Sequence, residues 1–358
     1  MKSLGKNFSL GSGKLKYITA KNLTKFGTID FSKCDFIDEE AKRIIHKRSD
    51  IRRGDILFSS RAPIGHCHLI TEEPDFYDIG ESIFSIRVNQ DVVLPEYLCL
   101  YLASDYFVKV ASKHTTGSII MEIRISDLMN TEIIIPPREI QKKIAKCLNK
   151  IDQKIELNKM VNDNLEQQIK TIFTFQFLQN ANTEWKQQSL AELSEMYQPK
   201  TISGKDLIAD GNYFVYGANG IIGKYNQYNH SESEIAVACR GASCGSIQMT
   251  LPFSWITGNA MVVKPHSDFP YREYLYYYLL AKNPNYLCSG SAQPQLTREN
   301  LTLYSLKVPS TTELNAFESY AGKVRKIIIK NQQENIELST LRDWLLPMLM
   351  NGQATISD

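Results

Sequence analysis

The stretch GDILFSSRAPIG, residues Gly54–Gly65, has the pattern of a buried apolar strand that runs into a tight turn carrying one arginine. The same pattern occurs again as SEIAVACRGASCG, residues Ser233–Gly245. In the first copy Asp55 precedes Arg61 by six positions, and in the second an acidic residue precedes Arg240 by the same distance. This recurrence of residue types at one spacing indicates that the chain contains a structural unit twice.

Three further pairs of segments recur in the same order. They are LPEYLCLYL (94–102) with YREYLYYYL (271–279), TTGSIIMEIRISDL (115–128) with CSGSAQPQLTRENL (288–301), and EIIIPPREI (132–140) with YSLKVPSTTEL (304–314). Every pair has nearly the same separation. We therefore interpret the chain as one diverged unit of about 175 residues present twice.

Each unit changes character once along its length. It begins with β-branched runs broken by glycine, proline and asparagine, for instance VYGANGIIGKYNQY at 215–228, which predict strands joined by tight turns. Prolines then precede a long helical pattern, and proline suits the first turn of a helix. We predict an α+β fold in which two β-rich domains (1–135 and 179–309) are joined by two long helices (136–178 and 310–352), with a tail at 353–358.

Both helical segments carry an a/d pattern with alternating steps of four and three residues. The pattern runs through Ile144, Leu148, Ile151, Ile155, Asn158, Asn162, Leu165, Ile169 and Ile172, and again through Phe317, Ala321, Val324, Ile328, Asn331, Asn335, Leu338, Arg342 and Leu345. Asn158 and Asn162 match Asn331 and Asn335, and buried asparagines are known to fix coiled-coil register. Arg342 breaks the apolar pattern, and no partner for it is evident from the sequence.

An antiparallel pairing of the helices places apolar residues opposite apolar residues and asparagines opposite asparagines. A parallel pairing also matches the asparagines, so the pattern does not decide the direction. At ~1.5 Å per residue, a helix of about 40 residues is roughly 60 Å long. An antiparallel coiled coil would hold the β-rich domains at opposite ends of a rod, whereas the alternative is two separate amphipathic helices, each packed on its own domain.

Composition sets broad limits on the class of protein. A chain of 358 residues with 43% hydrophobic and 22% charged residues is typical of a folded protein of two or more domains. The net charge of +2 neither requires nor excludes a polyanionic partner. Seven scattered cysteines without a Cys-x-x-Cys pair favour reduced thiols in the cytoplasm. No signal peptide and no apolar run of ~20 residues is visible, so we expect a soluble cytoplasmic protein without a membrane partner.

Tests for an active site find no catalytic constellation. GSGKL at 11–15 lacks the first glycine and the Ser/Thr of a Walker A motif. His66 and His68 lie on one face of an expected strand, but no second ligand pair is near in sequence. NPNY at 283–286 resembles the adenine methyltransferase signature but lacks its second proline, and no methyl-donor loop accompanies it. We therefore expect no catalytic residue, no metal and no cofactor.

The repeated layout resembles the specificity subunit of type I restriction–modification enzymes. The resemblance covers nearly the whole chain and rests on four segments in the order of that family: GDILFSSRAPIG, YGANGIIGKYNQY (216–228), IPPREIQKKIAKCL (135–148) and LRDWLLPMLMNG (341–352). It implies two target recognition domains joined by two long helices that pack as an antiparallel coiled coil. It also implies a non-catalytic subunit whose domains each read one half of a split target in double-stranded DNA.

The resemblance further implies the partners. Two methyltransferase (modification) subunits, which methylate adenine, would dock on the chain, and restriction subunits, which cleave DNA using ATP, would join through them. Two alternatives stay open from the sequence. One is a self-contained fused methyltransferase–specificity enzyme, and the other is a coiled-coil protein with two β domains that do not bind DNA.

The candidate DNA-binding residues are polar side chains at turns and loops. Arginine is the commonest reader of guanine, but an arginine shared by both units favours phosphate contact for Arg61 and Arg240. The alternative is a scaffold role, in which each arginine pairs with Asp55 or Glu234 or with a backbone carbonyl. The other candidates are Ser59, Ser60, Lys113, Thr115, Thr116, Gly117, Ser118, Asn219, Lys224, Ser291, Gln293 and Gln295.

Three other features bear on the interpretation. The basic run KRIIHKRSDIRR (42–53) either follows a DNA backbone or is a solvated face. The tyrosines at 274 and 276–278 are predicted to belong to a helix core rather than to a base-stacking platform. The second unit opens with WKQQSLAELSEMYQPK (185–200), whereas the first runs almost directly into a strand at Tyr17, so part of the usual first domain is absent or replaced.

Overall fold

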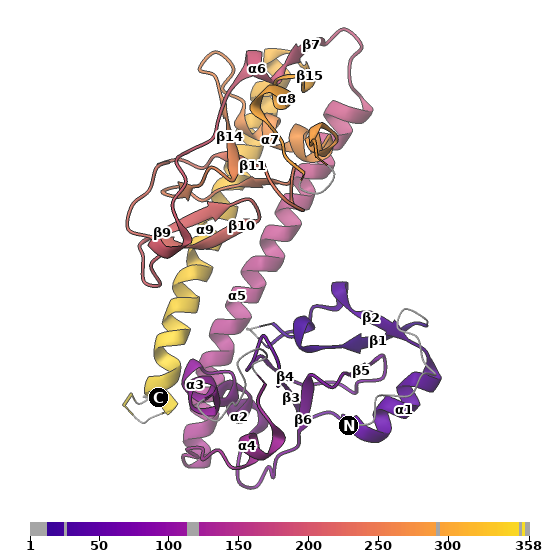
Figure 1. Cartoon of the computed structure of the whole chain (residues 1–358), viewed down its shortest axis with the longest axis vertical. Helices are drawn as coiled ribbons and strands as arrows, with labels where there is room; N and C mark the ends of the chain where they lie inside the picture. The colour runs from indigo at the N-terminus through magenta and orange to yellow at the C-terminus, as the bar shows by residue number, and fades with distance from the viewer. Residues whose placement is uncertain (1–12, 25–26, 113–121, 291–293, 351–352, 355–358) are drawn as a thin grey trace. The chain divides into compact units, whose positions relative to one another are not determined.

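The computed structural model describes residues 13–24, 27–112, 122–290, 294–350 and 353–354, and it divides the chain into two units. The first unit comprises Met1–Leu157 with Glu334–Asp358, and the second comprises Asn158–Gln333. Each unit contains one β-rich domain and a portion of each of two long helices, α5 (Arg138–Phe173) and α9 (Thr311–Met350) (Figure 1). The expected helices at 136–178 and 310–352 correspond to α5, which continues as a π-helical turn η3 (Thr174–Gln179), and to α9.

The first unit has two three-stranded sheets with strand orders β2-β1-β5 and β4-β3-β6. Its strands are β1 (Leu15–Ile18), β2 (Asp35–Ile37), β3 (Ile56–Ser59), β4 (Cys67–Leu69), β5 (Tyr77–Ile79) and β6 (Ile83–Ile86). Its helices before α5 are η1 (Ala20–Asn22), η2 (Phe31–Lys33), α1 (Glu39–Ser49), α2 (Pro95–Leu102), α3 (Asp105–Ser112) and α4 (Ile125–Met129).

The second unit has three sheets with strand orders β10-β9-β13, β12-β11-β14-β8 and β15-β7. Its strands are β7 (Lys186–Ser189), β8 (Ser194–Tyr197), β9 (Tyr213–Gly217), β10 (Gly220–Tyr225), β11 (Ile235–Ala238), β12 (Ile247–Met249), β13 (Trp255–Ile256), β14 (Ala260–Pro265) and β15 (Ser305–Val308). Its shorter helices are α6 (Leu190–Leu193), η4 (Gly204–Asp206), α7 (Arg272–Ala281), η5 (Pro284–Leu287) and α8 (Arg298–Thr302).

The two β-rich domains share a strand topology. In each, a fully buried strand, β3 or β11, lies between two antiparallel neighbours. In each, β1 or β9 has one antiparallel and one parallel neighbour. A tyrosine hydroxyl also makes the same bond in both domains: Tyr97 donates to the carbonyl of Ile134, and Tyr274 donates to that of Lys307. These positions are the ones that the sequence repeat aligns.

The tyrosines of α7 belong to the core, as predicted. Tyr274 and Tyr277 are almost completely buried, and their rings contact Phe173 and Phe317 of the two long helices. The apolar face of α7 is therefore covered by α5 and α9 within the second unit, and it is not available for stacking on bases.

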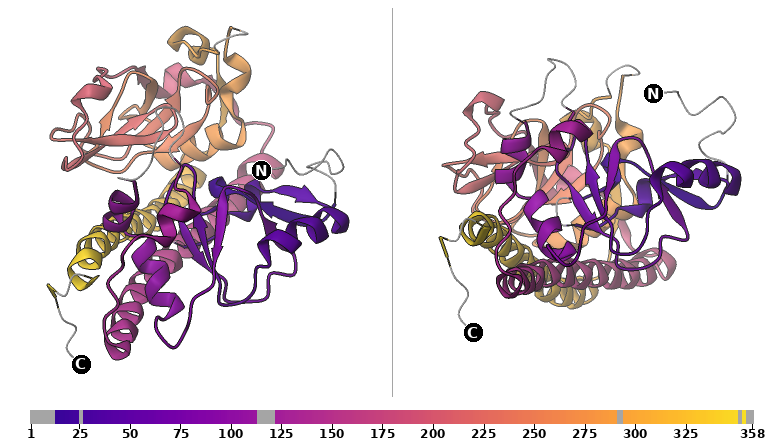
Figure 2. Two further views of the ribbon diagram at one scale, coloured as in Figure 1. Left: turned by 60° about the horizontal axis from the view of Figure 1, so that its bottom comes forward. Right: turned by 90° about the horizontal axis from the view of Figure 1, so that it is seen from below.

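In the first unit, α5 and α9 run in opposite directions and lie side by side (Figure 2). The side-chain amide of Asn335 donates to the carbonyl of Ile155 at 3.2 Å. Arg342, which interrupts the apolar pattern of the sequence, is 4% exposed and forms an ion pair with Asp152 at 2.8 Å. The partner that was not evident from the sequence is thus an acid on the opposite helix, which compensates a buried charge.

In the second unit the helices make a second set of buried polar contacts. The amide of Asn331 donates to the side-chain oxygen of Asn162 at 2.8 Å, and Asn162 donates to the carbonyl of Ile328. Arg325 is 7% exposed and pairs with Glu166 of α5 and with Glu273 of α7. These contacts also require the helices to run in opposite directions. Asn162 contacts Asn331, whereas Glu166, further along α5, contacts Arg325, which comes earlier in α9.

The amino terminus of α7 is capped by an acid from α9. The carboxylate of Glu318 accepts the backbone N–H groups of Glu273 at 3.1 Å and Tyr274 at 3.3 Å. Burial raises the pKa of Glu318 to about 7, because the loss of hydration outweighs these two hydrogen bonds, which favour the charged form. A protonated Glu318 is thus easier to bury than a charged one.

We predict that Glu318→Gln stabilises the chain at alkaline pH. A carboxyl group whose pKa is raised on folding contributes stability that is present below its unfolded pKa and is lost as pH rises through about 7. A glutamine keeps the accepting oxygen without the charge, so the variant should gain up to about 3 kcal/mol in unfolding free energy at pH 8 and less than about 1 kcal/mol at pH 5. Urea denaturation at both pH values measures the difference. An equal gain or loss at the two pH values would show that the charge of Glu318 is not responsible.

Candidate nucleic-acid interface

The arginine-bearing turns occupy the same place in both domains. Arg61 lies two residues after the end of the buried strand β3, and Arg240 lies two residues after the end of β11. Each arginine forms an isolated β-bridge with a later segment, Arg61 with Glu122 and Arg240 with Gln295. The backbone of each arginine is therefore held by the strand that precedes it and by the segment bridged to it. The bridged residue differs between the units.

The acid of the repeated pattern does not pair with the arginine. Asp55 is 1% exposed and pairs with Arg87 at 2.7 Å, whereas the guanidinium of Arg61 lies 3.1 Å from the carboxylate of Glu122. The expected scaffold pairing of Arg61 with Asp55 is therefore wrong. The reason is that β3 pairs with β6, with Ile56 opposite Ile86. Asp55 precedes Ile56 and Arg87 follows Ile86, so the two charged side chains lie next to each other.

Arg240 is the more accessible of the two arginines. Its side chain is exposed, and within the described part of the chain it has no hydrogen bond or ion pair. The acid that precedes it, Glu234, is 4% exposed, and burial raises its pKa. The alternative pairing of Arg240 with Glu234 is therefore not observed among the described residues.

Tight turns carry both arginines, and glycines close them. Gly65 and Gly245 have positive φ angles of 81° and 83°. A Cβ atom on Gly65 would meet Val108, and one on Gly245 would meet the backbone of Asn285. Each turn is thus pressed against a neighbouring segment, and a larger residue would displace it.

Ser59 and Ser60 are not DNA-contacting residues in this structure. Both are fully buried. The Ser59 hydroxyl donates to the carbonyl of Pro63 and accepts the N–H of His66 at 2.8 Å, and the Ser60 hydroxyl donates to the carbonyl of Ser82 at 3.1 Å. The prediction that they bind DNA is corrected: their hydroxyls bond backbone groups, those of Ser59 within the turn and that of Ser60 at Ser82, just before β6.

The remaining candidates divide into three groups. Asn219 is exposed at the turn between β9 and β10, and Gln295 is exposed beside Arg240. Lys224 lies on β10, with its ammonium group 5.6 Å from the centre of the Phe214 ring. The candidates that lie outside the described residues are Lys113, Thr115, Thr116, Gly117, Ser118, Ser291 and Gln293.

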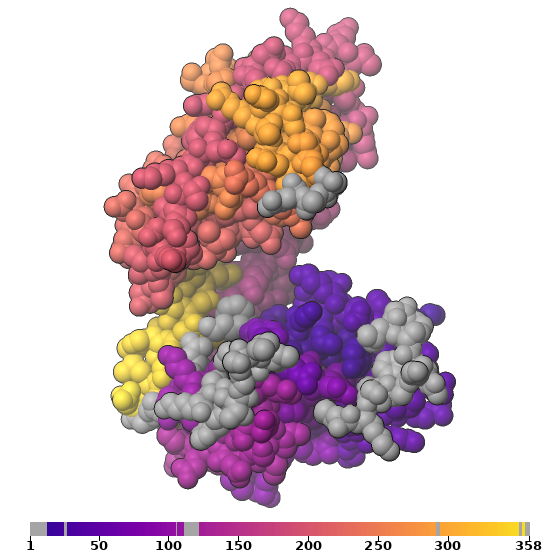
Figure 3. All heavy atoms as spheres, in the orientation of Figure 1, coloured from indigo at the N-terminus to yellow at the C-terminus, as the bar shows by residue number. Residues whose placement is uncertain are grey.

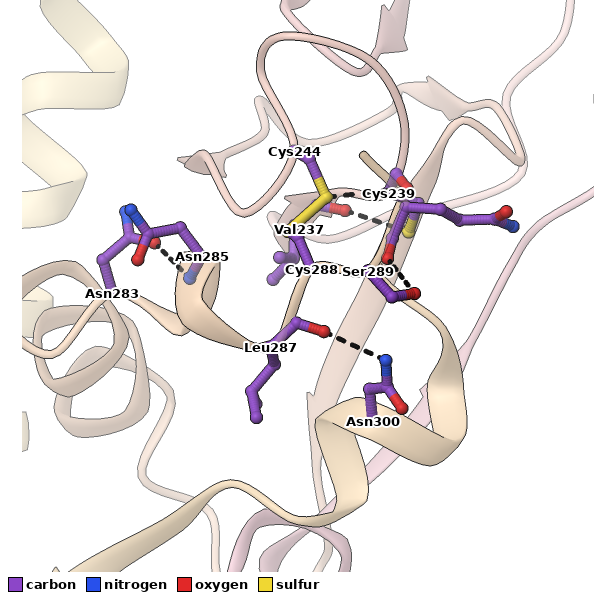
Figure 4. The surroundings of a disulfide bond; sticks show 10 residues. Val237, Cys239, Cys244, Asn283, Asn285, Leu287, Cys288, Ser289 and Asn300 are labelled. Atoms are coloured by element: carbon purple, nitrogen blue, oxygen red, sulfur yellow. Dashed lines mark hydrogen bonds between the residues drawn. A yellow bond between two sulfur atoms is a disulfide. The ribbon is translucent and has the colours of Figure 1, made fainter. Parts of the chain in front are cut away.

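A disulfide joins the two segments that flank Arg240. Cys244, in the turn after Arg240, is bonded to Cys288, which begins the segment leading to Gln295 (Figure 4). The expectation that all seven cysteines are reduced is therefore wrong for this pair. The pairing could not be read from spacing, since 44 residues separate the two cysteines and the fold brings them together.

Among the described residues, 288–290 and 294–302 contribute to the surface of the second unit (orange in Figure 3). Their backbone is tied to the end of β11 and the turn after it by two hydrogen bonds: Leu296 donates to Cys239 at 2.9 Å, and Gly241 donates to Pro294 at 3.0 Å. Within these residues, Ser289 and Gln295 exchange two further backbone hydrogen bonds. The corresponding bond in the first unit is donated by Ile123 to Ser60 at 2.9 Å. In both units, a later segment thus donates a backbone hydrogen bond to the residue that precedes the arginine.

Most of the basic run at 42–53 is engaged within the first unit. Arg48 donates to the carbonyl of Ile79, Arg52 pairs with Asp50, and His46 lies 3.1 Å from Asp78. These contacts favour the interpretation of the run as a structural helix face and its end rather than a continuous phosphate-binding stripe.

The other candidate sites have ordinary structural partners. His66 and His68 bond the carbonyls of Leu23 and Gly27, and the described residues contain no cluster of three His, Cys, Asp or Glu side chains suited to a metal. Asn283 of the NPNY segment caps η5 by accepting the N–H of Asn285 at 2.9 Å. Among the described helices, none combines the length and apolar character needed to span a bilayer.

One family profile, described as the type I restriction modification DNA specificity domain, matches the chain twice, at residues 5–167 and 182–338. The chain belongs to this family. The two matches fall on the two β-rich domains and the long helix portions that follow them.

Individual members of the specificity family are distant in sequence. The chain is 24% identical to the type I restriction enzyme MjaIX specificity subunit of Methanocaldococcus jannaschii over 97% of its own length and 88% of that protein. It is 32% identical to the HindI specificity subunit of Haemophilus influenzae over 43% of its length, which spans only 36% of that relative. A crystal structure of a type I restriction–modification S subunit from M. genitalium superimposes with a TM-score of 0.56 at 17% identity, covering 98% of this chain and 94% of that one. That likeness establishes a common fold.

We predict that Ser59→Ala destabilises the chain without a specific effect on DNA. The change leaves the N–H of His66 and the carbonyl of Pro63 without their shown partner inside the turn, which should cost roughly 1–3 kcal/mol. Thermal or urea unfolding measures the loss, and Ser126→Ala, at an exposed position of α4, is the control that should change stability little. Unchanged stability combined with weakened DNA binding of the folded variant would restore Ser59 to the DNA-contacting set.

Proposed function

We propose that this chain supplies the DNA sequence specificity of a type I restriction–modification complex, with each β-rich domain reading one half of a bipartite target. The single observation that supports it best is the double match of the DNA specificity profile, because each match falls on a domain with the same arginine-bearing turn. The subunit itself carries out no chemistry in this proposal, and catalysis belongs to its partners.

In the second domain, the proposed contact surface consists of exposed polar groups beside one turn. Arg240 and Gln295 are neighbours through a β-bridge, and both are exposed. Arginine suits guanine or phosphate, and the amide of glutamine suits the N6 and N7 groups of adenine. Asn219 and Lys224, on the β9–β10 hairpin, are the other proposed contacts of this domain.

In the first domain, Glu122 modulates the corresponding arginine. The ion pair leaves Arg61 about two-fifths exposed and partly neutralised. A phosphate can compete with an exposed carboxylate for a guanidinium, because exposed ion pairs contribute little free energy. We therefore assign Arg61 to backbone contact rather than to base readout, and we expect the base-reading residues of this domain to lie on other loops.

The long helices are proposed to set the distance between the two half-sites. Helix α5 begins in the first unit and ends in the second, and α9 does so in the reverse order. In each unit the helices make antiparallel contacts with buried polar residues, which is the expected behaviour of a coiled coil with a fixed register. A rigid helical pair of set length would then define the number of unread base pairs.

The proposed partners are double-stranded DNA, two methyltransferase subunits and, through the assembled complex, restriction subunits. Within this proposal the complex is a site-specific deoxyribonuclease and adenine methyltransferase. Co-expression with a cognate modification subunit in a host lacking adenine methylation, followed by sequencing of methylated adenines, tests it. A split motif that requires both chains supports the proposal. Methylation by this chain alone would favour a self-contained enzyme, and no methylation would favour β domains that do not bind DNA.

We predict that removing one heptad from each helix shortens the gap in the recognised motif. Deletion of 151–157 together with 336–342 removes Asp152 along with Arg342, so no buried charge loses its partner. Seven residues correspond to ~10 Å of helix, or about three base pairs of B-DNA. The methylated motif should keep both halves with a gap about three base pairs shorter.

The matched control is the deletion of 151–157 alone, which removes Asp152, the acid of the opposite helix that pairs with buried Arg342, and shifts the register. That variant should be unstable or unable to support methylation, since breaking a buried ion pair typically costs about 3–5 kcal/mol. A folded double deletion that methylates with the original gap would contradict the spacing role of the helices.

A further inference from the structure

The second unit contains a strand–helix–strand segment that has no counterpart among the described residues of the first unit. β7, α6 and β8 together occupy Lys186–Tyr197 and immediately precede the rest of that domain. β7 pairs with β15, β8 pairs with the edge of β14, and α6 packs on α8 (Figure 1). Leu190 and Leu193 of α6 are almost completely buried.

Among the described residues of the first unit, no strand pairs with the second edge of β6, the strand equivalent to β14. Ile56 pairs with Ile86 as Ile235 pairs with Val263, so β6 takes the place of β14. β14 lies between β11 and β8, whereas β6 has β3 as its only strand neighbour in the described chain. Met261, Val262 and Val263 are fully buried, but their counterparts Phe84, Ser85 and Ile86 are all partly exposed.

The partner positions of β7 and α6 are also uncovered in the first unit. Residues 132–135 correspond to β15, yet they form no strand, and Ile134 and Ile135 are 47% and 41% exposed. Helix α4 corresponds to α8, and its Ile125 and Met129 are 56% and 80% exposed. Three surfaces that a single segment covers in the second unit are therefore all accessible in the first.

A cavity of about 690 Å³ joins these surfaces. Its walls come from β6, from α2 and α4, and from Thr131 and Ile133, and they include Phe107 of α3 and the ends of α1 and β5. Arg48, Glu81 and Arg87 are the charged residues of the lining. The lining is mainly apolar, as expected of a place that receives the leucines of a short helix.

We propose that this face of the first unit is a docking site for a strand–helix–strand segment of the Lys186–Tyr197 type, carried by a separate polypeptide. One strand adds to the free edge of β6, the other pairs with 132–135, and a leucine-bearing turn of helix fills the cavity against α4. Main-chain pairing gives the affinity and the apolar anchors give the specificity, as in other cases of strand addition. The proposal does not depend on DNA recognition.

The experiment joins a copy of residues 185–200 to the amino terminus of the full chain through a flexible Gly/Ser linker of about 20 residues. Such a linker spans roughly 25 Å and presents the segment at an effective concentration in the millimolar range. The control fusion carries Leu190→Asp and Leu193→Asp in the added copy only. Hydrogen exchange is compared at the β6 amides that point away from β3 and at 132–135, with β14 and β15 as internal references.

We expect exchange at β6 and 132–135 to be at least about tenfold slower in the fusion than in its control, with β14 and β15 unchanged. Met129→Asp in the fused chain, at an exposed position of α4, should return these amides to the control rates. Equal exchange in the fusion and its control would overturn the proposal. So would faster exchange at β6 after deletion of residues 1–12 from the unfused chain, because the chain's own amino-terminal segment would then be the occupant.

Discussion

The buried polar contacts between α5 and α9 are the constraint on which the rest of the structure depends. Apolar a/d residues alone tolerate a slip of one heptad, because leucine and isoleucine pack against one another in many registers. The Asn162–Asn331 hydrogen bond, the Asp152–Arg342 pair and the Glu166–Arg325 pair do not tolerate it. A slip would leave buried charges and amides without their partners, at a cost of several kcal/mol for each broken ion pair. One register of α5 against α9 is therefore strongly preferred within each unit.

The two β-rich domains show how one backbone arrangement can present two different sets of side chains. Each places an arginine at the end of a buried strand and ties that strand end to a later segment by the same backbone hydrogen bond. The residue across the bridge is Glu122 in one domain and Gln295 in the other. In the second domain the Cys244–Cys288 disulfide adds a covalent link that the first domain cannot form. The two domains thus share the scaffold around the arginine and differ in the side chains presented beside it.

The sequence predicted the features that repeat along the chain and missed those that depend on three-dimensional neighbours. The heptad pattern is a property of one segment at a time, so both long helices were predicted closely. The neutralisation of Arg342 by Asp152 depends on the helix direction, which the pattern left open. Ser59 and Ser60 look like polar loop residues in the sequence, and only the fold shows that they bond to buried backbone groups. The repeat itself suggests why Arg61 does not pair with Asp55, since Arg87 occupies the strand position where Lys264 stands in the second domain.

The central claim is that each domain reads its own half-site, while the helices determine the gap. The most direct measurement replaces residues 198–304, leaving β7 to β8, β15 and both long helices intact, with the corresponding segment of a family member whose half-site has been determined. Sequencing of methylated adenines in cells that express this hybrid with its modification subunit reports the new motif. The account predicts that one half changes to the donor's half-site, while the other half and the gap stay as they were. A change in both halves, or in the gap, would contradict it.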